Sequence, residues 1–428
     1  MILELGQIPV KDIAWGEKTL LDGGVLRIHR EELIEKTRGD DARLASVEAD
    51  IARPGESVRI IPVKDVIEPR VKVAGRGGMF PGFIAGVETV GEGRTHVLRG
   101  CAVVTAGRIV GFQEGLIDMS GPGARYSAFS QLLNVVLSLD VKPGLSRHEH
   151  EEALRLAGLR AAVYLAEAGR SVTPAFMERF AMRLPLKTKE SASDLPGVVY
   201  LYMLLSQGLL HDTYLYGQDL KNLLPTLISP TEVMDGAVVS GNCVSACDKN
   251  TTYHHQNNPV IRELFNRDGK ELRFLGTVVA NCNVTLQDKQ RSAEFAAKLV
   301  ELLGADGAVI TKEGFGNPDA DAMMYCALLE GRGIRTVLLT DEFAGVDGAS
   351  QSLADTTSQA DALVSTGNAN ERITLPPMDK VIGDIRVVEK IAGGQSGSLS
   401  REGITVELQA VTGATNELGF ELLSARGE

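Results

Sequence analysis

The chain has 428 residues, of which 44% are hydrophobic, and its formal net charge is −12 at pH 7. This length suggests roughly two to three domains and allows a sizeable core. The acidic balance and the lack of a long Lys/Arg cluster argue against nucleic-acid and anionic-membrane partners.

The N-terminal residues and the cysteines favour a cytoplasmic protein. The opening MILELGQIPVKDIAWGEK has no basic stretch followed by a sustained apolar one, unlike a signal peptide. The chain also lacks the run of about 18 apolar residues that a membrane-spanning helix needs. The five cysteines are an odd number in a chain too long to need disulfides, so a reducing compartment is expected. They are Cys101, Cys243, Cys247, Cys282 and Cys326.

Short β-branched runs predict a strand-rich N-terminal region. Examples are 58–66 (VRIIPVKDV) and 96–104 (HVLRGCAVV), and turns rich in glycine and proline, such as 75–83, separate them. We expect residues 1–145 to form a strand-rich domain that resembles a barrel or a sandwich. From 147 to 169, apolar residues recur at helical spacing and end in glycine, which predicts an amphipathic helix.

A mixed α/β segment, 146–242, is expected next, with a buried strand at 198–205 (VVYLYMLL), and residues 243–428 are expected to form an α/β domain. The pattern of this last part predicts strands at 272–280, 307–311, 336–340 and 362–365, and helices at 289–303 and 319–333. Such alternation implies right-handed βαβ units and a parallel, Rossmann-like sheet. The predicted fold class is therefore α/β.

Three polar loops follow predicted strands of this sheet. They are 313–319 (EGFGNPD), 341–345 (DEFAG) and 366–371 (TGNANE). Parallel sheets bind ligands beyond the carboxyl ends of their strands, where these loops would offer backbone amides, carboxylates and carboxamides. Either the loops bind a ligand, or their Gly, Asn and Asp residues only form turns.

Reactive side chains are concentrated in residues 241–258, GNCVSACDKNTTYHHQNN, which allow three interpretations. Cys243, Cys247, His254 and His255 could bind zinc, but neighbouring histidines point apart on a strand and sit about 100° apart on a helix. The stretch could instead be a polar loop with inert cysteines.

The third interpretation is cleavage of the chain before Cys243. Its thiolate can attack the carbonyl of Asn242 and form a thioester, and Gly241 permits the strained backbone that this attack needs. An unperturbed thiol has a pKa of about 8.5, so a nearby base or cation would help. Candidates for that group are Lys249, His254 and His255. Hydrolysis of the thioester would free an N-terminal cysteine nucleophile, whereas elimination would leave a pyruvoyl group.

A second Asn-Cys pair, Asn281-Cys282, provides an internal comparison. It lies at or just past the end of a predicted strand and has no flanking glycine. We therefore expect Cys282 to be structural. The setting of the pair, rather than the dipeptide itself, indicates the reactive position.

Long and unusual strings along the chain resemble a known family. The most specific is 240–259, SGNCVSACDKNTTYHHQNNP. Others are 52–60 (ARPGESVRI), 111–115 (GFQEG), 118–123 (DMSGPG), 206–213 (SQGLLHDT), 314–318 (GFGNP), 347–355 (DGASQSLAD) and 412–419 (TGATNELG). Over essentially its whole length the chain resembles the component B proprotein of the glycine/sarcosine/betaine reductase complex. The D-proline reductase proprotein is a more distant relative.

The resemblance implies self-processing between Asn242 and Cys243, which separates residues 1–242 and 243–428 into two subunits. Cys243 would become the covalent pyruvoyl cofactor, and no metal is expected. The amine of a small amino acid such as glycine would form a Schiff base with the pyruvoyl ketone. A selenocysteine of a separate component B subunit would then attack the α-carbon and release ammonia or an amine. Selenoprotein component A and component C would carry the product on to acetyl phosphate.

Local roles and rival functions stay open at this point. Lys249 or His254 could move protons and Asp248 could orient one of them, or all three could be loop architecture. Cys247 is either a second thiol near the site or a small buried residue. The rival functions are a hydrolase with Cys243 as its N-terminal nucleophile and a zinc-stabilised interaction module, and the chain could also stay uncleaved. Glycine, sarcosine and betaine are all candidate substrates, but betaine has no N–H and would need another mode of activation.

Overall fold

The computed structural model describes residues 1–111, 114–182, 194–206, 213–241, 246 and 248–418. Helices and strands are mixed along the chain, which confirms the predicted α/β class. Within the described ranges, no helix combines the length and the apolar character that crossing a bilayer requires.

The N-terminal half is built on two main sheets, as the β-branched runs predict. The larger sheet has the order β10-β6-β9-β11-β5, with β23 beside β6. These strands are Gly115–Asp118, Val58–Ile67, Cys101–Gly107, Leu133–Val141, Leu44–Ala52 and Lys380–Gly383. The second sheet, β12-β1-β8-β7, consists of Phe176–Ala181, Ile2–Pro9, Gly93–Arg99 and Arg70–Ala74. A small sheet β2-β4-β3 (Asp12–Trp15, Val25–Ile28, Leu20–Asp22) and helix α1 (Arg30–Arg38) complete this half.

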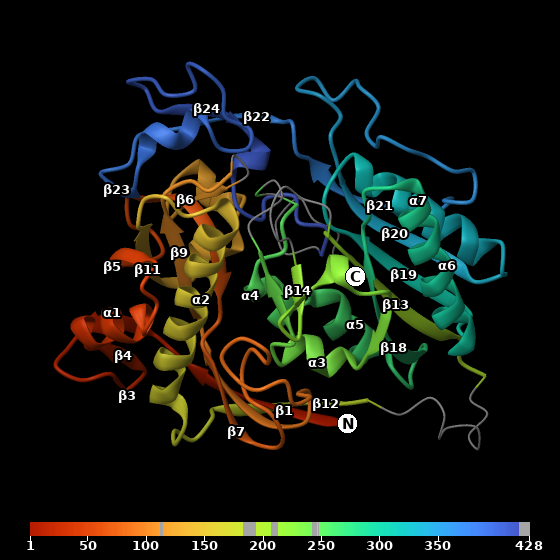
Figure 1. Cartoon of the computed structure of the whole chain (residues 1–428), viewed down its shortest axis with the longest axis horizontal. Helices are drawn as coiled ribbons and strands as arrows, with labels where there is room; N and C mark the ends of the chain where they lie inside the picture. Colours follow the sequence, from red (N-terminus) through yellow and green to blue (C-terminus); the bar gives the residue numbers. More distant parts are fainter. Residues whose placement is uncertain (112–113, 183–193, 207–212, 242–245, 247, 419–428) are drawn as a thin grey trace.

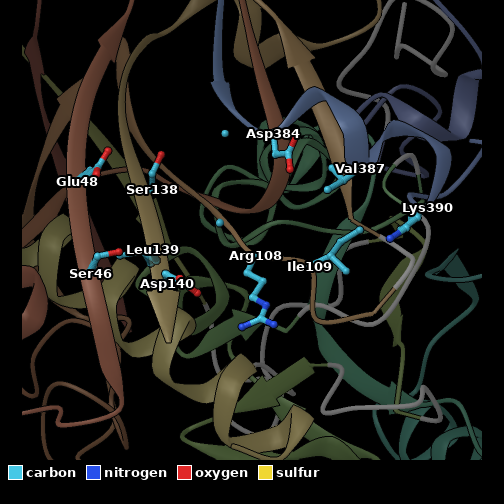
Figure 2. A pocket seen from close by; sticks show the side chains of 12 residues that line it. Ser46, Glu48, Arg108, Ile109, Ser138, Leu139, Asp140, Asp384, Val387 and Lys390 are labelled. Atoms are coloured by element: carbon cyan, nitrogen blue, oxygen red, sulfur yellow. The ribbon is translucent and has the colours of Figure 1, made fainter. Parts of the chain in front are cut away.

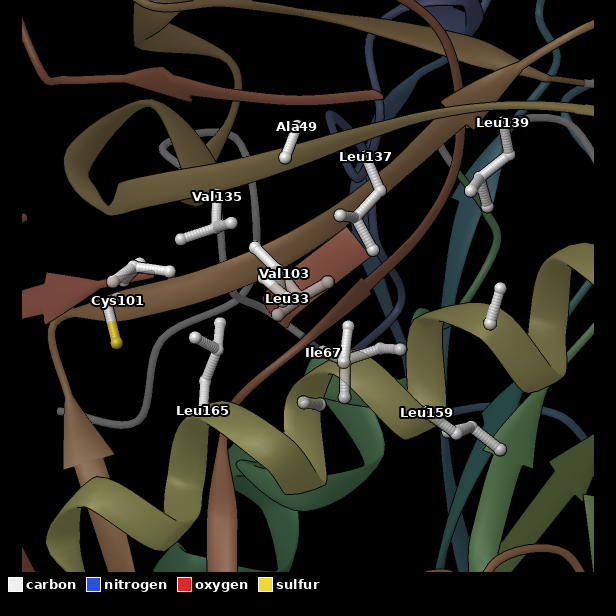
Figure 3. Packing of buried hydrophobic residues seen from close by; sticks show 14 of the residues in the cluster. Leu33, Ala49, Ile67, Cys101, Val103, Val135, Leu137, Leu139, Leu159 and Leu165 are labelled. Atoms are coloured by element: carbon white, nitrogen blue, oxygen red, sulfur yellow. The ribbon is translucent and has the colours of Figure 1, made fainter. Parts of the chain in front are cut away.

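The predicted long helix is confirmed as α2 (Arg147–Ala166), which packs on the larger sheet. Its Leu165 and Val103 of β9 are buried in the same apolar cluster (Figure 3). Gly158 allows a close approach of the helix to the sheet, because a Cβ atom at this position would lie only 2.5 Å from Thr105 Cγ2.

Helix α2 is less amphipathic than its spacing predicts. Glu151 and Arg155 are both buried, and Arg155 Nε donates a hydrogen bond to Glu151 Oε1 at 2.9 Å. The Arg155 guanidinium also lies 4.0 Å from the ring centroid of Tyr214, on strand β14 (Thr213–Leu215). Partners from a distant strand therefore bury a face that the sequence pattern assigns to solvent.

The C-terminal half contains the predicted parallel sheet, in the order β16-β18-β13-β19-β20-β21. In this order the strands are Thr226–Ile228, Arg273–Asn281, Gly197–Leu204, Gly307–Lys312, Arg335–Glu342 and Leu363–Asn368. All neighbours are parallel except β16 and β18. Helices α6 (Leu286–Leu302) and α7 (Asn317–Glu330) also agree with the predicted helices within a few residues.

Alternate residues of β13 contribute to the two faces of this sheet. Val199 and Leu201 belong to the core beneath α6 and α7. Tyr200 and Tyr202 point to the opposite face, where their rings stack with centroids 4.9 Å apart. The remaining short elements are α3 (Pro230–Met234), α4 (Thr252–Gln256), α5 (Pro259–Arg267), β15 (Gln218–Asp219), β17 (Val238–Ser240), β22 (Arg372–Leu375) and β24 (Ile404–Glu407). Helix α4 lies between the two halves of the molecule (Figure 1).

The sheets run across the segments 1–145, 146–242 and 243–428 expected from the sequence. Strand β13 of the middle segment is hydrogen-bonded between β18 and β19 of the last one. Strand β12 of the middle segment pairs with β1, and β23 of the last segment pairs with β6. The three segments therefore share their main sheets.

This topology predicts that a chain cut between Asn242 and Cys243 stays assembled. The two fragments would share buried backbone hydrogen bonds on both sides of β13, and a dissociated edge would leave them unpaired. Both fragments should elute as one species from a size-exclusion column in native buffer and separate only in denaturant. Separation in native buffer would contradict the prediction.

Candidate functional site

The carboxyl ends of β13, β19 and β20 meet the stretch that the sequence marks as reactive. Asn242, Cys243 and Cys247 lie outside the described residues. Ser240 and Ala246, close to the expected cleavage position, are both buried. Ser240 N donates to Thr252 Oγ1 at 3.2 Å, and Ala246 O accepts from Gly413 N at 2.8 Å. The described flanks of the stretch are therefore held in the interior.

Four buried carboxyl groups lie together at this edge of the sheet. They are Asp248, Glu313, Asp341 and Glu417. Lys312 is the nearby cation, and its Nζ donates to Asp319 Oδ1 at 2.5 Å. Like charges in a buried site favour the protonated form of a carboxyl group, so this arrangement is suited to holding protons.

The pKa values of these carboxyl groups follow from their surroundings. Burial raises the pKa of Asp248 well above its usual range, and the neighbouring charge of Asp341 raises it further. Burial, and then the charge of Glu313, does the same to the pKa of Glu417. Burial also raises the pKa of Asp341 to about 7, against the opposing effect of Lys312. Burial and neighbouring like charges therefore favour the protonated form of these carboxyl groups.

Asn250 ties the reactive stretch to these carboxyl groups. Its backbone N–H donates to Glu313 Oε1 at 3.0 Å, and its Nδ2 donates to Glu417 Oε1 at 2.5 Å. Its Oδ1 accepts from Asn416 Nδ2 at 2.8 Å. Backbone and side chain of one residue thus bind two of the carboxyl groups and a segment near the C-terminus.

Lys249 points away from the carboxyl groups that surround Asp248. Its Nζ donates to the backbone carbonyl of Lys64 on β6. A small cavity on this side is lined by Val63, Lys64, Glu114, Gly115, Ala246, Lys249 and Thr412. Glu114 Oε2 and Thr412 Oγ1 are buried there without a hydrogen-bond partner among the described residues. The side chains of the neighbouring residues Asp248 and Lys249 therefore point to opposite halves of the molecule.

The two histidines lie on α4 and point apart, as helical spacing requires. His254 Nδ1 accepts from Thr251 N at 3.1 Å, whereas His255 Nδ1 lies 2.7 Å from Tyr202 Oη. Burial lowers the pKa of His254 well below its usual value and that of His255 to about 3. Both rings are therefore neutral at physiological pH. Over the described residues, no group of three or more His, Cys, Asp or Glu side chains is arranged to hold a metal.

The side chains of the three polar loops differ in their surroundings. Glu313 and Asp341 face the buried carboxyl cluster. Asn368 joins loops instead, because its Nδ2 donates to Gly345 O at 2.8 Å and its Oδ1 accepts from Ala344 N at 3.0 Å. The loop 341–345 therefore contains one residue that faces the cluster and two that hold the turn.

Several residues of the site were missed in the sequence. Glu417 and Asn416 lie far along the chain, inside the string TGATNELG that was read only as a resemblance. Lys64 and Asp65 carried a usable signal, because together with Arg59 they are charged residues in a strand that is otherwise apolar. All of β6 is buried. Charged residues in such a strand need specific partners.

The three described cysteines and the surface hollow beside β5 were compared with the carboxyl cluster as alternative sites. Cys101, Cys282 and Cys326 are free and buried, and burial raises the pKa of Cys282 well above its usual value, as expected for a structural thiol. A surface hollow of about 580 Å³ lies beside β5, β11 and residues 383–390 (Figure 2). Its lining mixes acidic and basic side chains and shares none with the carboxyl cluster.

The fold and the site define an α/β protein with a buried, carboxyl-rich site at the carboxyl ends of parallel strands. The chain belongs to the family of glycine/sarcosine/betaine reductase component B subunits, whose family model matches residues 1–426. This membership confirms the resemblance seen in the sequence and makes the chain a component B of such a reductase.

Named relatives agree with this family over the full chain. The chain is 57% identical to the glycine reductase complex component B subunits alpha and beta of Peptoclostridium acidaminophilum, over all of both chains. It is 51% identical to the sarcosine reductase complex component B subunit alpha of the same organism, again over all of both chains. The D-proline reductase proprotein PrdA of Acetoanaerobium sticklandii is 23% identical, over 81% of this chain and 55% of that protein. No solved structure gives a significant match.

Replacing Asp341 by Asn should stabilise the protein at neutral and alkaline pH. In the wild type this carboxyl group has a pKa of about 7 in the folded state against an ordinary value of 3.8. Its contribution to stability is therefore complete below about pH 4 and is lost as the pH rises to about 7. The unfolding free energy of D341N relative to wild type should increase by roughly 1–4 kcal/mol between about pH 4 and pH 8.

Urea unfolding at several pH values measures this difference. Asp361→Asn, at an exposed position, is the control for the change from aspartate to asparagine. A pH-independent difference for D341N would show that Asp341 is not held protonated.

Proposed function

We propose that the chain cleaves itself between Asn242 and Cys243 and that Cys243 becomes a pyruvoyl group which activates the substrate of component B. The observation that carries this proposal is the buried carboxyl cluster that includes Asp248 and binds Asn250, a few residues after the expected cleavage site. A relative that matches the chain from end to end is named for two subunits, alpha and beta, which fits processing of one chain into two.

The described surroundings suit a small polar group. Asp248 Oδ1 and Glu417 Oε2 are buried without a hydrogen-bond partner among the described residues. His255 Nε2 on α4 is also buried without a hydrogen-bond partner among the described residues. Buried polar atoms normally find a partner, so these atoms are available to a carbonyl, an amine or a water molecule.

The side chains of the stretch have separate roles in this proposal. Asp248 holds a proton on its carboxyl group and can pass it to the amide nitrogen of Cys243 when the thiol attacks Asn242. Lys249 brings a cation into the same segment, which favours the thiolate. His254 is neutral and positions the first turn of α4 through its bond from Thr251 N.

A pyruvoyl group supplies an electrophilic ketone that can bind a substrate amine covalently and weaken its Cα–N bond. The carboxyl cluster can accept a hydrogen bond from the amine of a small amino acid such as glycine or sarcosine and can take up or return its proton. Attack by a selenocysteine of a separate component B subunit then releases ammonia or an amine. Components A and C of the complex receive the carboxymethyl group and form acetyl phosphate.

Cleavage should depend on Cys243 and not on Cys282. Cys243→Ala should run as one full-length band on a denaturing gel, because no thiol remains to attack Asn242. Cys282→Ala is the matched control, since it alters the other Asn-Cys pair, and it should still give two fragments. Two fragments from C243A would show that the cleavage site is wrong.

The mass of the C-terminal fragment separates a pyruvoyl protein from an N-terminal cysteine hydrolase. Conversion of the terminal cysteine removes sulfur and nitrogen and adds oxygen, so the fragment should be lighter by about 33 Da than the sequence predicts. An unmodified mass, with an intact thiol, would support the hydrolase instead.

Borohydride trapping tests the amine chemistry directly. Radiolabelled glycine or sarcosine, reduced with borohydride in the presence of the processed protein, should label only the C-terminal fragment. Betaine is the control, because it has no N–H and should leave the fragment unlabelled. Absence of label with both amines would contradict covalent activation of the substrate.

A further inference from the structure

We propose that Glu313 is a positioning residue for self-processing, because its carboxylate clamps both flanks of the cleavage site to the end of the parallel sheet. The inference rests on the proposed function and adds a residue to it. Glu313 lies directly after β19 and is buried, and its backbone N–H donates to Met203 O at 3.1 Å. The carboxylate is thus fixed at the carboxyl end of the sheet.

The Glu313 carboxylate accepts hydrogen bonds from three separate segments. Its Oε2 accepts from Leu205 N at 2.8 Å and from Thr213 Oγ1 at 3.1 Å. Its Oε1 accepts from Asn250 N at 3.0 Å. Leu205 follows β13, Thr213 begins β14, and Asn250 lies in the reactive stretch, on the C-terminal side of the expected cleavage site.

These contacts reach both sides of the bond between Asn242 and Cys243. Thr213 of β14 pairs with Ser240 of β17, the strand that leads into the cleavage site. Asn250 is bound directly on the other side. A single carboxylate therefore joins Asn250, seven residues after Cys243, to Thr213, whose strand pairs with Ser240 two residues before Asn242. Attack on a peptide carbonyl needs such fixed geometry, because misplacement of the reacting atoms by about 1 Å can reduce a rate about a hundredfold.

Only a carboxylate satisfies all of these donors. Three N–H and O–H groups converge on two oxygens, and each would be buried without a partner beside an apolar residue. Glutamine would keep one accepting oxygen and turn an NH₂ group toward the other donors. The Glu313 carboxylate is therefore buried close to Asp248 and Glu417 because it joins these three segments.

Glu313→Gln should slow the appearance of the two fragments by at least about tenfold, the equivalent of ~1.4 kcal/mol in activation free energy. Cleavage is followed on denaturing gels after synthesis of the full chain. Glu330→Gln is the matched control: Glu330 Oε1 alone accepts from Thr336 N and Oγ1, so glutamine can preserve both bonds. E330Q should cleave at the wild-type rate, and wild-type cleavage of E313Q would overturn the proposal.

A pH profile distinguishes positioning from general loss of stability. The groups facing Asp248 and Glu417 are Glu313, Asp341 and Lys312. Removing the Glu313 charge lowers the pKa of Asp248 and of Glu417, so the alkaline limb of the E313Q cleavage rate should move to lower pH. A slower rate with an unmoved profile would mean only weaker folding and would overturn the proposal.

Thr213→Val supplies a second test in case E313Q does not fold. It removes one donor to Glu313 while keeping the shape of the side chain, and it should slow cleavage by a smaller factor than E313Q. The two substitutions together should be less than additive, because both disrupt one clamp. Full additivity, or wild-type cleavage of T213V, would overturn the proposal.

Hydrogen exchange tests the clamp even if the proposed function fails. In the uncleaved Cys243→Ala background, adding Glu313→Gln should speed exchange of the Asn250 amide by about tenfold, because its acceptor is lost. Unchanged exchange would overturn the clamp. Failure of the pyruvoyl proposal would appear instead in the fragment mass, with the effect of Glu313 on cleavage and exchange intact.

Discussion

The burial of a polar segment between two sheets is the constraint on which this structure depends. Residues 248–258 are buried and rich in amides, hydroxyls and charges, so each polar group needs a partner. The N-terminal half supplies some of them: Asp65 accepts from Thr252 N at 2.9 Å and from Thr252 Oγ1 at 2.6 Å. The C-terminal half supplies others, such as Tyr202 for His255. The segment therefore holds the two halves in one arrangement.

Buried charges strengthen this arrangement by making it specific. Glu68 pairs with Arg70 at 2.6 Å, and the same Arg70 donates to Asn257 Oδ1 at 3.0 Å. Asn257 Nδ2 donates back to Glu68 at 3.1 Å. Removing one partner of such a buried pair costs about 3–5 kcal/mol, because an uncompensated charge is left in the interior. Displacement of the segment by one residue would remove the Asn257 amide from both charged groups, so the position of the segment is closely defined.

The same burial determines which groups of the site hold protons. Carboxyl groups that would be ionised on the surface keep their protons here, because water is excluded and like charges are close. The histidines of α4 are neutral for the first of these reasons. For the proposed cleavage, the described proton donors are therefore carboxylic acids rather than imidazolium groups. In our proposal Asp248 donates a proton itself, whereas the sequence suggested that it could orient another donor.

The sequence alone determined the local elements and the family. Helical and β-branched spacing identified α2, α6, α7 and the parallel strands, because these patterns depend on neighbouring residues. It also singled out residues 241–258 as reactive. Tertiary structure decided which residues meet there. Glu417 reaches Asn250 across 167 positions, β13 joins the sheet of a later segment, and adjacent residues Asp248 and Lys249 turn to opposite halves. None of these contacts produces a repeating pattern in the sequence, because each arises from the packing of the two halves around one buried segment.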